Sequence, residues 1–156
     1  MSFRLAAYGV CRVDGRVLLA RYVAPGGEGS WWTLPGGQVE FAEDPVVAVV
    51  RELEEETGLR GVVEELLGVD SRVIPAHEAR RGEVHQNVGV FYGVRVVGGV
   101  VRPEANGETA EAVWTPVEEI AKLPRSVVVD VGVGLATQRP ASGHLPPMAI
   151  GGLVRH

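Results

Sequence analysis

Apolar and polar residues alternate, or apolar residues run together, in several short stretches of this chain, which predicts a series of β-strands. The turn signal Asp14-Gly15 separates the first two stretches and favours a hairpin there. The expected strands cover residues 3–13, 16–23, 32–34, 37–40, 62–74 and 85–97. Two polar segments at residues 75–83 and 98–110, the second rich in Gly, Pro and Glu, are expected to be loops.

A helical pattern follows the fourth of these strands, over residues 45–57. Asp44 can cap the amino end of a helix, and Pro45 suits its first turn because an N–H has no helical partner there. Gly58 supplies the left-handed residue that ends the helix. The apolar residues that share one face of this helix, and should pack on a core, are Val46, Val49, Val50 and Leu53.

The last third of the chain predicts two more helices. Thr115-Pro116-Val117-Glu118 has the form of a capping box that opens a short helix. Residues 126–137 are expected to form the last helix, despite their β-branched valines and two glycines. Residues 139–156 are rich in Gly and Pro and are expected to be a loosely packed tail. Mixed strands with helices before and after them indicate a single α/β domain, residues 1–156, built as an α/β/α sandwich.

Composition agrees with a small cytoplasmic enzyme. The 156 residues, 46% of them hydrophobic, suffice for one core. Cys11 is the single cysteine, which excludes an internal disulfide, and the amino-terminal residues contain no long apolar run. The formal net charge is −5, without a basic cluster beyond Arg80-Arg81. We therefore expect neither a polymeric nucleic acid nor a membrane as the main partner.

Carboxylates are concentrated on one side of the expected helix at residues 45–57. Glu52, Glu55 and Glu56 stand at positions i, i+3 and i+4, so they share a face and repel one another. Hard divalent cations that prefer oxygen ligands, Mg²⁺ above all, would turn this repulsion into coordination. On these three residues alone, the alternative is an acidic helix face that is simply solvated.

The spacing around these glutamates resembles the Nudix box, in which a glycine, a glutamate and an Arg-Glu helix motif stand at fixed intervals. The matching residues are Gly37, Glu43, Arg51, Glu52, Leu53, Glu55, Glu56, Gly58 and Leu59. Residues 32–37 and Trp114-Thr115-Pro116 also look like the family, and the resemblance covers roughly residues 3–137. A small departure is Ala42, where many members carry glycine.

The resemblance implies an α/β/α sandwich around a mixed sheet and hydrolysis of the diphosphate linkage in a nucleoside diphosphate derivative. It implies Mg²⁺, with Mn²⁺ as a substitute, and an orienting role for Arg51. Glu43 would anchor its loop or hold a second metal ion. The metal ligands that it implies are Glu52, Glu55, Glu56 and the carbonyl group of Gly37.

The sequence leaves two places for the general base: the box, and the loop expected at residues 98–110 with the residues directly after it, called the late loop below. Glu55 is the candidate from the box, whereas Glu104, Glu108 and Glu111 precede Trp114 and could reach over the metal site. Glu108 and Glu111 are preferred within the loop because they are nearer the expected strand, which would hold them rigidly.

The box does not define the substrate. We expect the substrate to be a small nucleotide, and a nucleoside triphosphate is preferred to ADP-ribose or a nucleotide sugar. Pro75 is the only residue that points to ADP-ribose instead. Two other classes stay open: a non-catalytic nucleotide-binding Nudix module, and an isomerase of prenyl diphosphates, which would need a catalytic cysteine and has only Cys11. A homodimer is possible, since dimers are frequent in the family.

Overall fold

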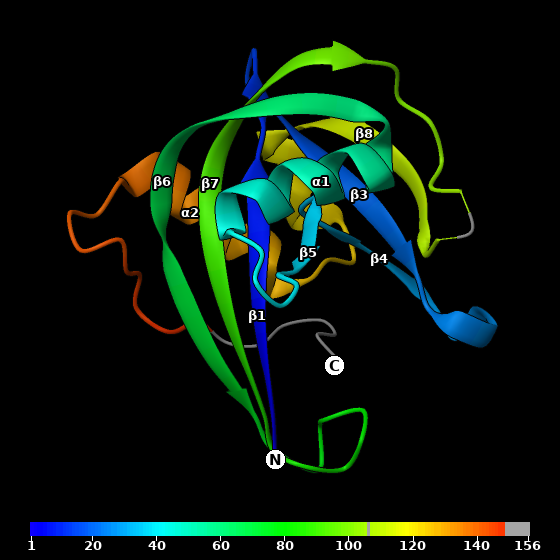
Figure 1. The fold of residues 1–156 in the computed structure, drawn as a ribbon, viewed down its shortest axis with the longest axis vertical. Helices are drawn as coiled ribbons and strands as arrows, with labels where there is room; N and C mark the ends of the chain where they lie inside the picture. Colours follow the sequence, from blue (N-terminus) through cyan, green and yellow to red (C-terminus); the bar gives the residue numbers. More distant parts are fainter. Residues whose placement is uncertain (106, 149–156) are drawn as a thin grey trace.

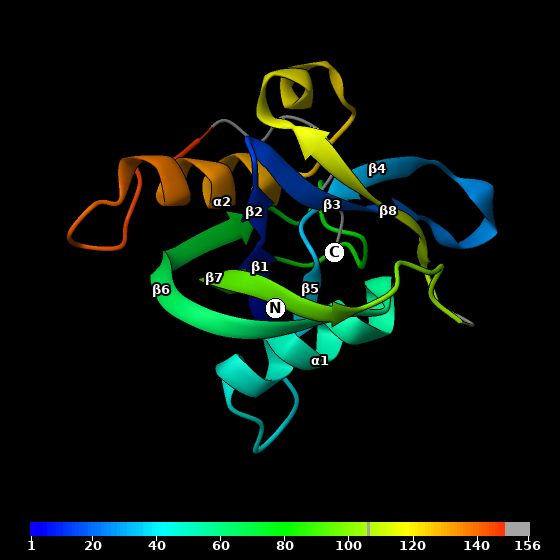
Figure 2. The same cartoon turned by 90° about the horizontal axis from the view of Figure 1, so that it is seen from above.

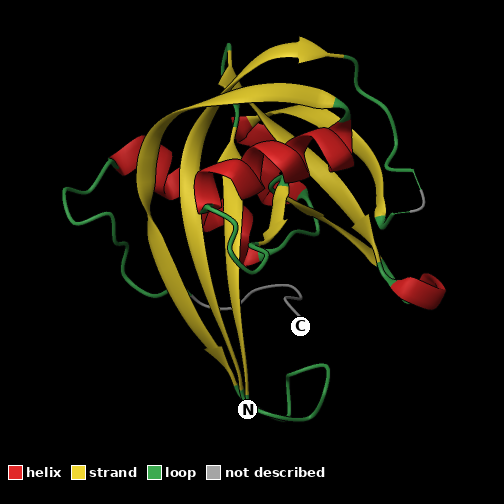
Figure 3. Cartoon of the chain, in the orientation of Figure 1, coloured by secondary structure: helices red, strands yellow, loops and turns green. Residues whose placement is uncertain are grey.

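The computed structural model describes residues 1–105 and 107–148. Strands dominate it, with two α-helices and two 3₁₀ helices between them (Figure 3). In chain order the elements are β1 (Ser2–Val10), β2 (Arg12–Val13), β3 (Arg16–Val23), η1 (Pro25–Gly27), β4 (Ser30–Thr33), β5 (Gly36–Gln38), α1 (Pro45–Thr57), β6 (Leu59–Ile74), β7 (His85–Gly99), β8 (Thr109–Pro116), η2 (Val117–Lys122) and α2 (Val127–Gln138).

The strands form two sheets. The larger sheet has the order β5-β1-β7-β6, in which β1 and β7 are parallel and the other pairs are antiparallel. The smaller sheet places β3 between β2 and β4, and β8 also pairs antiparallel with β3. The fold is therefore of the mixed α/β class that the sequence predicts.

The two α-helices cover opposite faces of the strands, as Figures 1 and 2 show. Ala7 and Leu18 pack in one core with Val49 and Leu53 of α1, and the second core joins the neighbouring strand residues to α2. Alternate residues of one strand point to opposite faces, so β1 and β3 supply both cores. The expected α/β/α sandwich is confirmed.

Helix α1 begins and ends where the sequence predicts. The carboxylate of Asp44 accepts a hydrogen bond from the N–H of Val46 at 2.9 Å, and Gly58 adopts a left-handed conformation with φ 81°. These two ends fix the length of the helix, and they thereby fix which glutamates stand on its last turns.

Helix α2 is confirmed to within one residue, and its glycines have a packing reason. The hydroxyl group of Ser126 caps its amino end by accepting from Val128 at 3.2 Å. A Cβ atom at Gly132 would lie 2.4 Å from Leu34, so only glycine allows the helix to approach the strands this closely. Burial on the sheet therefore outweighs the poor helix propensity of glycine and valine.

Three local expectations differ from the structure. The predicted strand 3–13 is divided at Cys11 into β1 and β2, and β6 begins at Leu59, directly after the helix. The capping box is wrong: Thr115 lies in β8 and its hydroxyl group donates to the carbonyl oxygen of Val113 at 3.1 Å. Pro116 occupies the cap position of η2, and no side chain caps it.

The segment after α2 is better anchored than expected in its described part. Leu145 is buried in the core that contains α2, and the carbonyl oxygen of Gly143 accepts from the N–H of Val69 at 2.9 Å. Residues 149–156 of the expected tail lie outside the described residues. Within the described part of the chain, no helix is long and apolar enough to span a bilayer.

Candidate active site

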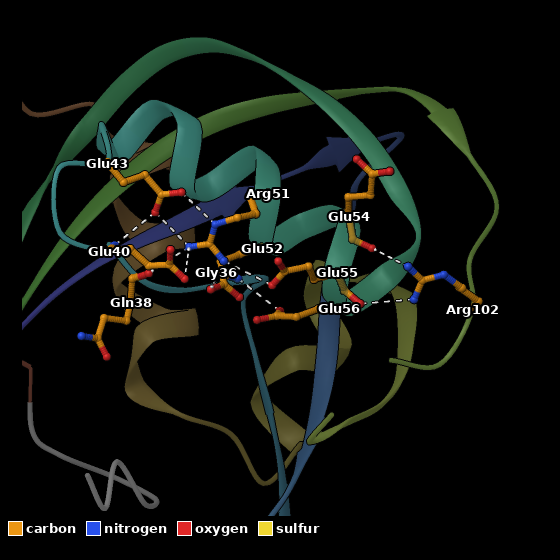
Figure 4. Close-up of polar contacts among 10 residues, drawn as sticks. All are labelled: Gly36, Gln38, Glu40, Glu43, Arg51, Glu52, Glu54, Glu55, Glu56 and Arg102. Carbon is orange, nitrogen blue, oxygen red and sulfur yellow. Dashed lines mark hydrogen bonds and ion pairs between the residues drawn. The ribbon is translucent and has the colours of Figure 1, made fainter. Parts of the chain in front are cut away.

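Arg51 stands at the centre of the glutamates of α1 and of the preceding loop (Figure 4). Its guanidinium group binds both carboxylate oxygens of Glu43, at 2.8 and 2.9 Å, and the Nη1 atom binds Glu52 at 2.9 Å. The same atom reaches Glu55, one helical turn away, at 3.2 Å, and Nη2 reaches the carbonyl oxygen of Gln38 at 3.2 Å. One arginine therefore holds three carboxylates and the end of β5 in a single network.

Glu43 belongs to this network because of the loop that precedes the helix. Its carboxylate also accepts from the N–H of Glu40 at 3.1 Å, and its side chain is only 13% exposed. Its pKa is lowered to about 2 by the hydrogen bonds from Arg51 and from the Glu40 backbone. Ala42 closes this turn with a positive φ of 63°, which explains why glycine is common at this position.

Glu52 and Glu56 form a second contact, on the side of α1 that faces β5. A Cβ atom on Gly37 would lie 2.9 Å from the carboxyl carbon of Glu52, so the carboxyl group lies directly against that glycine. The N–H of Gly36 donates to Glu56 at 3.3 Å. Burial, then the charge of Glu52, raise the pKa of Glu56 well above its usual range, and a hydrogen bond between the two carboxyl groups adds to this. The carboxyl group of Glu56 therefore keeps its proton to a higher pH than an exposed glutamate does.

The arrangement fits a divalent cation chemically. A proton on one of two adjacent carboxyl groups relieves their repulsion, and a divalent cation can take its place. Among the described residues, no three acidic, histidine or cysteine side chains already converge as a ligand set. Glu55 is half exposed and bound to Arg51, so it would have to turn to join Glu52 and Glu56.

The late loop is tied to the carboxyl end of α1 by Arg102, a residue that the sequence reasoning missed. The guanidinium group of Arg102 donates to the carbonyl oxygens of Glu54 at 3.1 Å and Glu55 at 3.2 Å (Figure 4). Its own N–H donates to the carbonyl oxygen of Thr57 at 2.9 Å. An isolated arginine in a loop gives no sequence signal for this role, because it needs the carbonyl groups at the end of a helix that lies far away in the chain.

Glu104, two residues after Arg102, is the late-loop glutamate with an electrostatic effect on Glu56. Its charge contributes to the raised pKa of Glu56, after burial and the effect of Glu52. Its carboxylate accepts one hydrogen bond, from the N–H of Thr109 at 3.0 Å. Glu108 and Glu111, which the sequence favours as the base, have different surroundings.

The side chains of Glu108 and Glu111 bind residues outside the group formed by Arg51 and the glutamates of α1. The carboxylate of Glu111 binds Arg21 at 3.1 Å, across the β3–β8 pair. Its neighbour Ala112 packs in the core that contains α1, so Glu111 faces the opposite side of the sheet. Glu108 is hydrogen-bonded to Tyr22. The structure therefore does not bring these two candidates to Glu52 and Glu56.

Comparisons with known proteins identify the family of the chain. A family model described as NUDIX domain matches residues 3–131. The chain belongs to the Nudix family. The RNA pyrophosphohydrolase of Stenotrophomonas maltophilia (strain K279a) is 32% identical over 155 residues, covering 90% of this chain and 68% of that protein. The ADP-ribose pyrophosphatase of Methanocaldococcus jannaschii is 34% identical over 119 residues, covering 76% of this chain and 65% of that protein.

A solved structure shows the same Nudix fold. A NUDIX hydrolase from Nitrosomonas europaea aligns over 92% of both chains with a TM-score of 0.69, and at 20% identity it supports the fold alone. The chain spans 54%, 36% and 34% of the lengths of the first curated relatives that it matches. The family is thus established, whereas the reaction is a matter for proposal.

Cys11 does not have the properties of a catalytic residue in this Nudix fold. Its side chain is 1% exposed and packs in the core beneath α1. Burial raises the pKa of its thiol to about 12. A thiol that stays protonated and enclosed is a poor nucleophile or acid, which disfavours the isomerase alternative.

Proposed function

We propose that the chain is a Mg²⁺-dependent Nudix hydrolase that cleaves the diphosphate linkage of a nucleoside diphosphate derivative. The observation that carries this proposal is the contact of Glu52 and Glu56 against Gly36 and Gly37. A carboxyl group as enclosed as that of Glu56 is unfavourable when charged unless a cation or a proton compensates it. A chain that only bound a nucleotide would not need this pair together with the Arg51 network.

Each residue of the site has a separate role in the proposed reaction. Glu52 and Glu56 would hold the metal ion, with Glu55 and the carbonyl group of Gly37 as further ligands. A bound Mg²⁺ neutralises phosphoryl oxygens and lowers the pKa of a coordinated water. Arg51 is a positioning residue, because it holds the carboxylates of Glu43, Glu52 and Glu55 at fixed places.

For the general base we place Glu104 ahead of the other candidates. Its carboxylate lies within electrostatic reach of Glu56 and carries a single hydrogen bond from Thr109, so oxygen lone pairs are available. Glu55 remains the alternative within the box, but its carboxylate is bound to Arg51. Glu108 and Glu111 have partners on the β3 side.

A nucleoside triphosphate is the substrate that we propose, and the release of a nucleoside monophosphate and pyrophosphate is the expected reaction. The names of the two relatives point to alternative substrates, RNA and ADP-ribose. With a net charge of −5, the chain suits a small anion whose charge is met locally better than a long polyanion.

A substrate panel with matched variants tests the proposal. Nucleoside triphosphates, ADP-ribose, nucleotide sugars and a 5′-triphosphorylated RNA are incubated with Mg²⁺ in ¹⁸O-water, and the products are analysed by mass spectrometry. One phosphoryl product should carry the label, EDTA should stop the reaction, and Glu56→Gln should abolish most of it. Glu54→Gln, an exposed neighbour on the same helix, is the control and should stay active.

Metal-independent turnover would contradict the proposed chemistry. Absence of turnover on every substrate would instead favour the non-catalytic nucleotide-binding module.

A further inference from the structure

Arg102 joins the late loop to the carboxyl end of the helix that carries the site (Figure 4). Its guanidinium group donates to the carbonyl oxygens of Glu54 and Glu55, and its backbone N–H donates to that of Thr57. The last carbonyl groups of a helix lack partners within the helix and carry a partial negative charge. A cationic side chain from a distant part of the sequence therefore completes the last turn of α1.

The same guanidinium group also binds the backbone that leads into Glu104. Its Nη1 atom, which holds the carbonyl oxygen of Glu55, donates to the carbonyl oxygen of Pro103 at 3.2 Å as well. That carbonyl group belongs to the peptide bond between Pro103 and Glu104, and the proline ring fixes its own φ at about −65°. One nitrogen atom thus links the end of the helix to the backbone directly before Glu104.

Glu104 has a second support on its other side. Its N–H donates to the carbonyl oxygen of Thr109 at 3.2 Å, and the N–H of Thr109 donates to the Glu104 carboxylate at 3.0 Å. Thr109 is the first residue of β8, which pairs with β3. The carboxylate is therefore held between a strand of the smaller sheet and, through Arg102, the last turn of α1.

The glycine that ends the box allows the late loop to lie this close. A Cβ atom on Gly58 would meet the carbonyl oxygen of Val100 and would lie 2.7 Å from the Cγ atom of Arg102. The left-handed conformation of Gly58 ends the helix, and its missing side chain leaves room for the arginine stem. This glycine thus serves the loop as well as the helix.

We propose that Arg102 is a positioning residue for the hydrolysis: it ties the carboxylate of Glu104 to the last turn of α1 and thereby sets its place relative to the metal site. This inference rests on the proposed function, in which Glu104 is the general base. A base must lie within hydrogen-bond reach of the proton that it takes, and a misplacement of about 1 Å can cost about 10²-fold in rate. In this role Arg102 acts through Glu104 and not on the substrate.

Steady-state kinetics of Arg102→Met test this role. Methionine keeps an unbranched stem beside Gly58 but removes every donor of the guanidinium group. We expect kcat to fall about 10²-fold, while KM and the dissociation constant of Mg²⁺ stay within about twofold of the wild-type values. Arg102→Lys, which keeps the charge without the planar fork, should recover part of the loss. Arg95→Met removes an exposed arginine of β7 that pairs with Glu64, and this control should keep the wild-type kcat.

A double-mutant cycle separates the positioning of Glu104 from any other effect of Arg102. Once Glu104→Gln has removed the base, Arg102→Met should lower kcat by less than about twofold further. An equal loss in both backgrounds overturns the proposal. A silent Glu104→Gln also overturns it, because Arg102 then has no base to position. A third contrary result is an Arg102→Met enzyme with a raised KM or weakened Mg²⁺ binding at an unchanged kcat.

Hydrogen exchange provides a measurement that does not depend on turnover. In EDTA, nuclear magnetic resonance follows the amide of Thr109, whose N–H binds Glu104. Arg102→Met should speed its exchange about tenfold or more, the effect of one charge-assisted hydrogen bond, and Arg95→Met should not. An unchanged rate in Arg102→Met overturns the proposal. A wild-type protein without turnover on the substrate panel overturns the proposed function itself, whereas in an active enzyme the outcomes above concern Arg102 and Glu104 alone.

Discussion

The raised pKa of Glu56 should make the metal-free protein less stable as the pH rises. Burial, then the charge of Glu52, raise the pKa of Glu56 above its ordinary value of 4.5, so the native state keeps a proton that the unfolded chain loses. This contribution to stability is fully present below about pH 4.5. It is lost as the pH rises toward and through the raised native pKa.

The size of this pH dependence of stability follows from the binding of one proton. Between the unfolded and native pKa values the native state binds about one proton more, so the free energy of unfolding falls by about 1.4 kcal/mol per pH unit. With a urea m-value of about 1–3 kcal/mol/M, the midpoint of unfolding moves by roughly 0.5–1.4 M urea per pH unit.

Urea unfolding in EDTA, followed by circular dichroism from pH 5 to pH 8, measures this slope. Glu56→Gln has no titrating group there, and its amide can still accept from Gly36 and donate to Glu52. Subtracting its stability from that of the wild type removes the histidines and other shared groups. The difference should fall as the pH rises, with the slope of one proton until the native pKa of Glu56 is reached. Glu54→Gln, on the exposed side of the helix, should keep the wild-type slope.

Parallel curves for the wild type and Glu56→Gln across this range would refute the reasoning. Added Mg²⁺ provides a second check, because it should restore stability to the wild type at pH 8 and restore less to Glu56→Gln. A ligand at 100 times its dissociation constant contributes about 2.7 kcal/mol, which this assay resolves easily.

Three further outcomes are expected. Glu104→Gln should lower turnover by about 10²–10⁴-fold while the affinity for Mg²⁺ barely changes. Glu111→Gln loses only the contact with Arg21, so its kcat and KM should stay near the wild-type values. Ala42→Gly should raise the free energy of unfolding by several tenths to about 1 kcal/mol, measured by urea unfolding, because the left-handed turn no longer strains a Cβ atom. Cys11 should not react with a thiol reagent at pH 8 until the chain is unfolded, as labelling with and without urea would show.

Local signals predicted the helix that carries the site. The helix-capping effects of Asp44, Pro45 and Gly58 depend only on residues a few positions away. The sequence therefore predicts them, and α1 has the predicted bounds. The pairing of Arg51 with Glu55 also follows from helical spacing. That Arg51 additionally holds both oxygens of Glu43 depends on the turn at Ala42, which spacing alone does not reveal.

Contacts between distant segments could not be predicted in the same way. Which late-loop glutamate approaches Glu56 depends on the Arg102 anchor and on the face to which each β8 residue points. The register of β3 and β8 shifts between Arg21 and Tyr22, and a shift of one residue exchanges the two faces. Thr115 shows the same limit, because a capping pattern in the sequence was overridden by strand pairing.

The anchoring of the late loop at both ends bears on how substrate range can change in evolution. Arg102 fastens one end to the carbonyl groups of α1, and the N–H of Val23 fastens the other by donating to the carbonyl oxygen of Glu108 at 2.8 Å. Insertions between Glu104 and Glu108 would therefore be isolated from the helix that holds the carboxylates, and each doubling of loop length costs only about 0.6 kcal/mol. A library of insertions there could acquire new specificities without moving Glu52 and Glu56, whereas the place of Glu104 would depend on keeping its hydrogen bond from the N–H of Thr109.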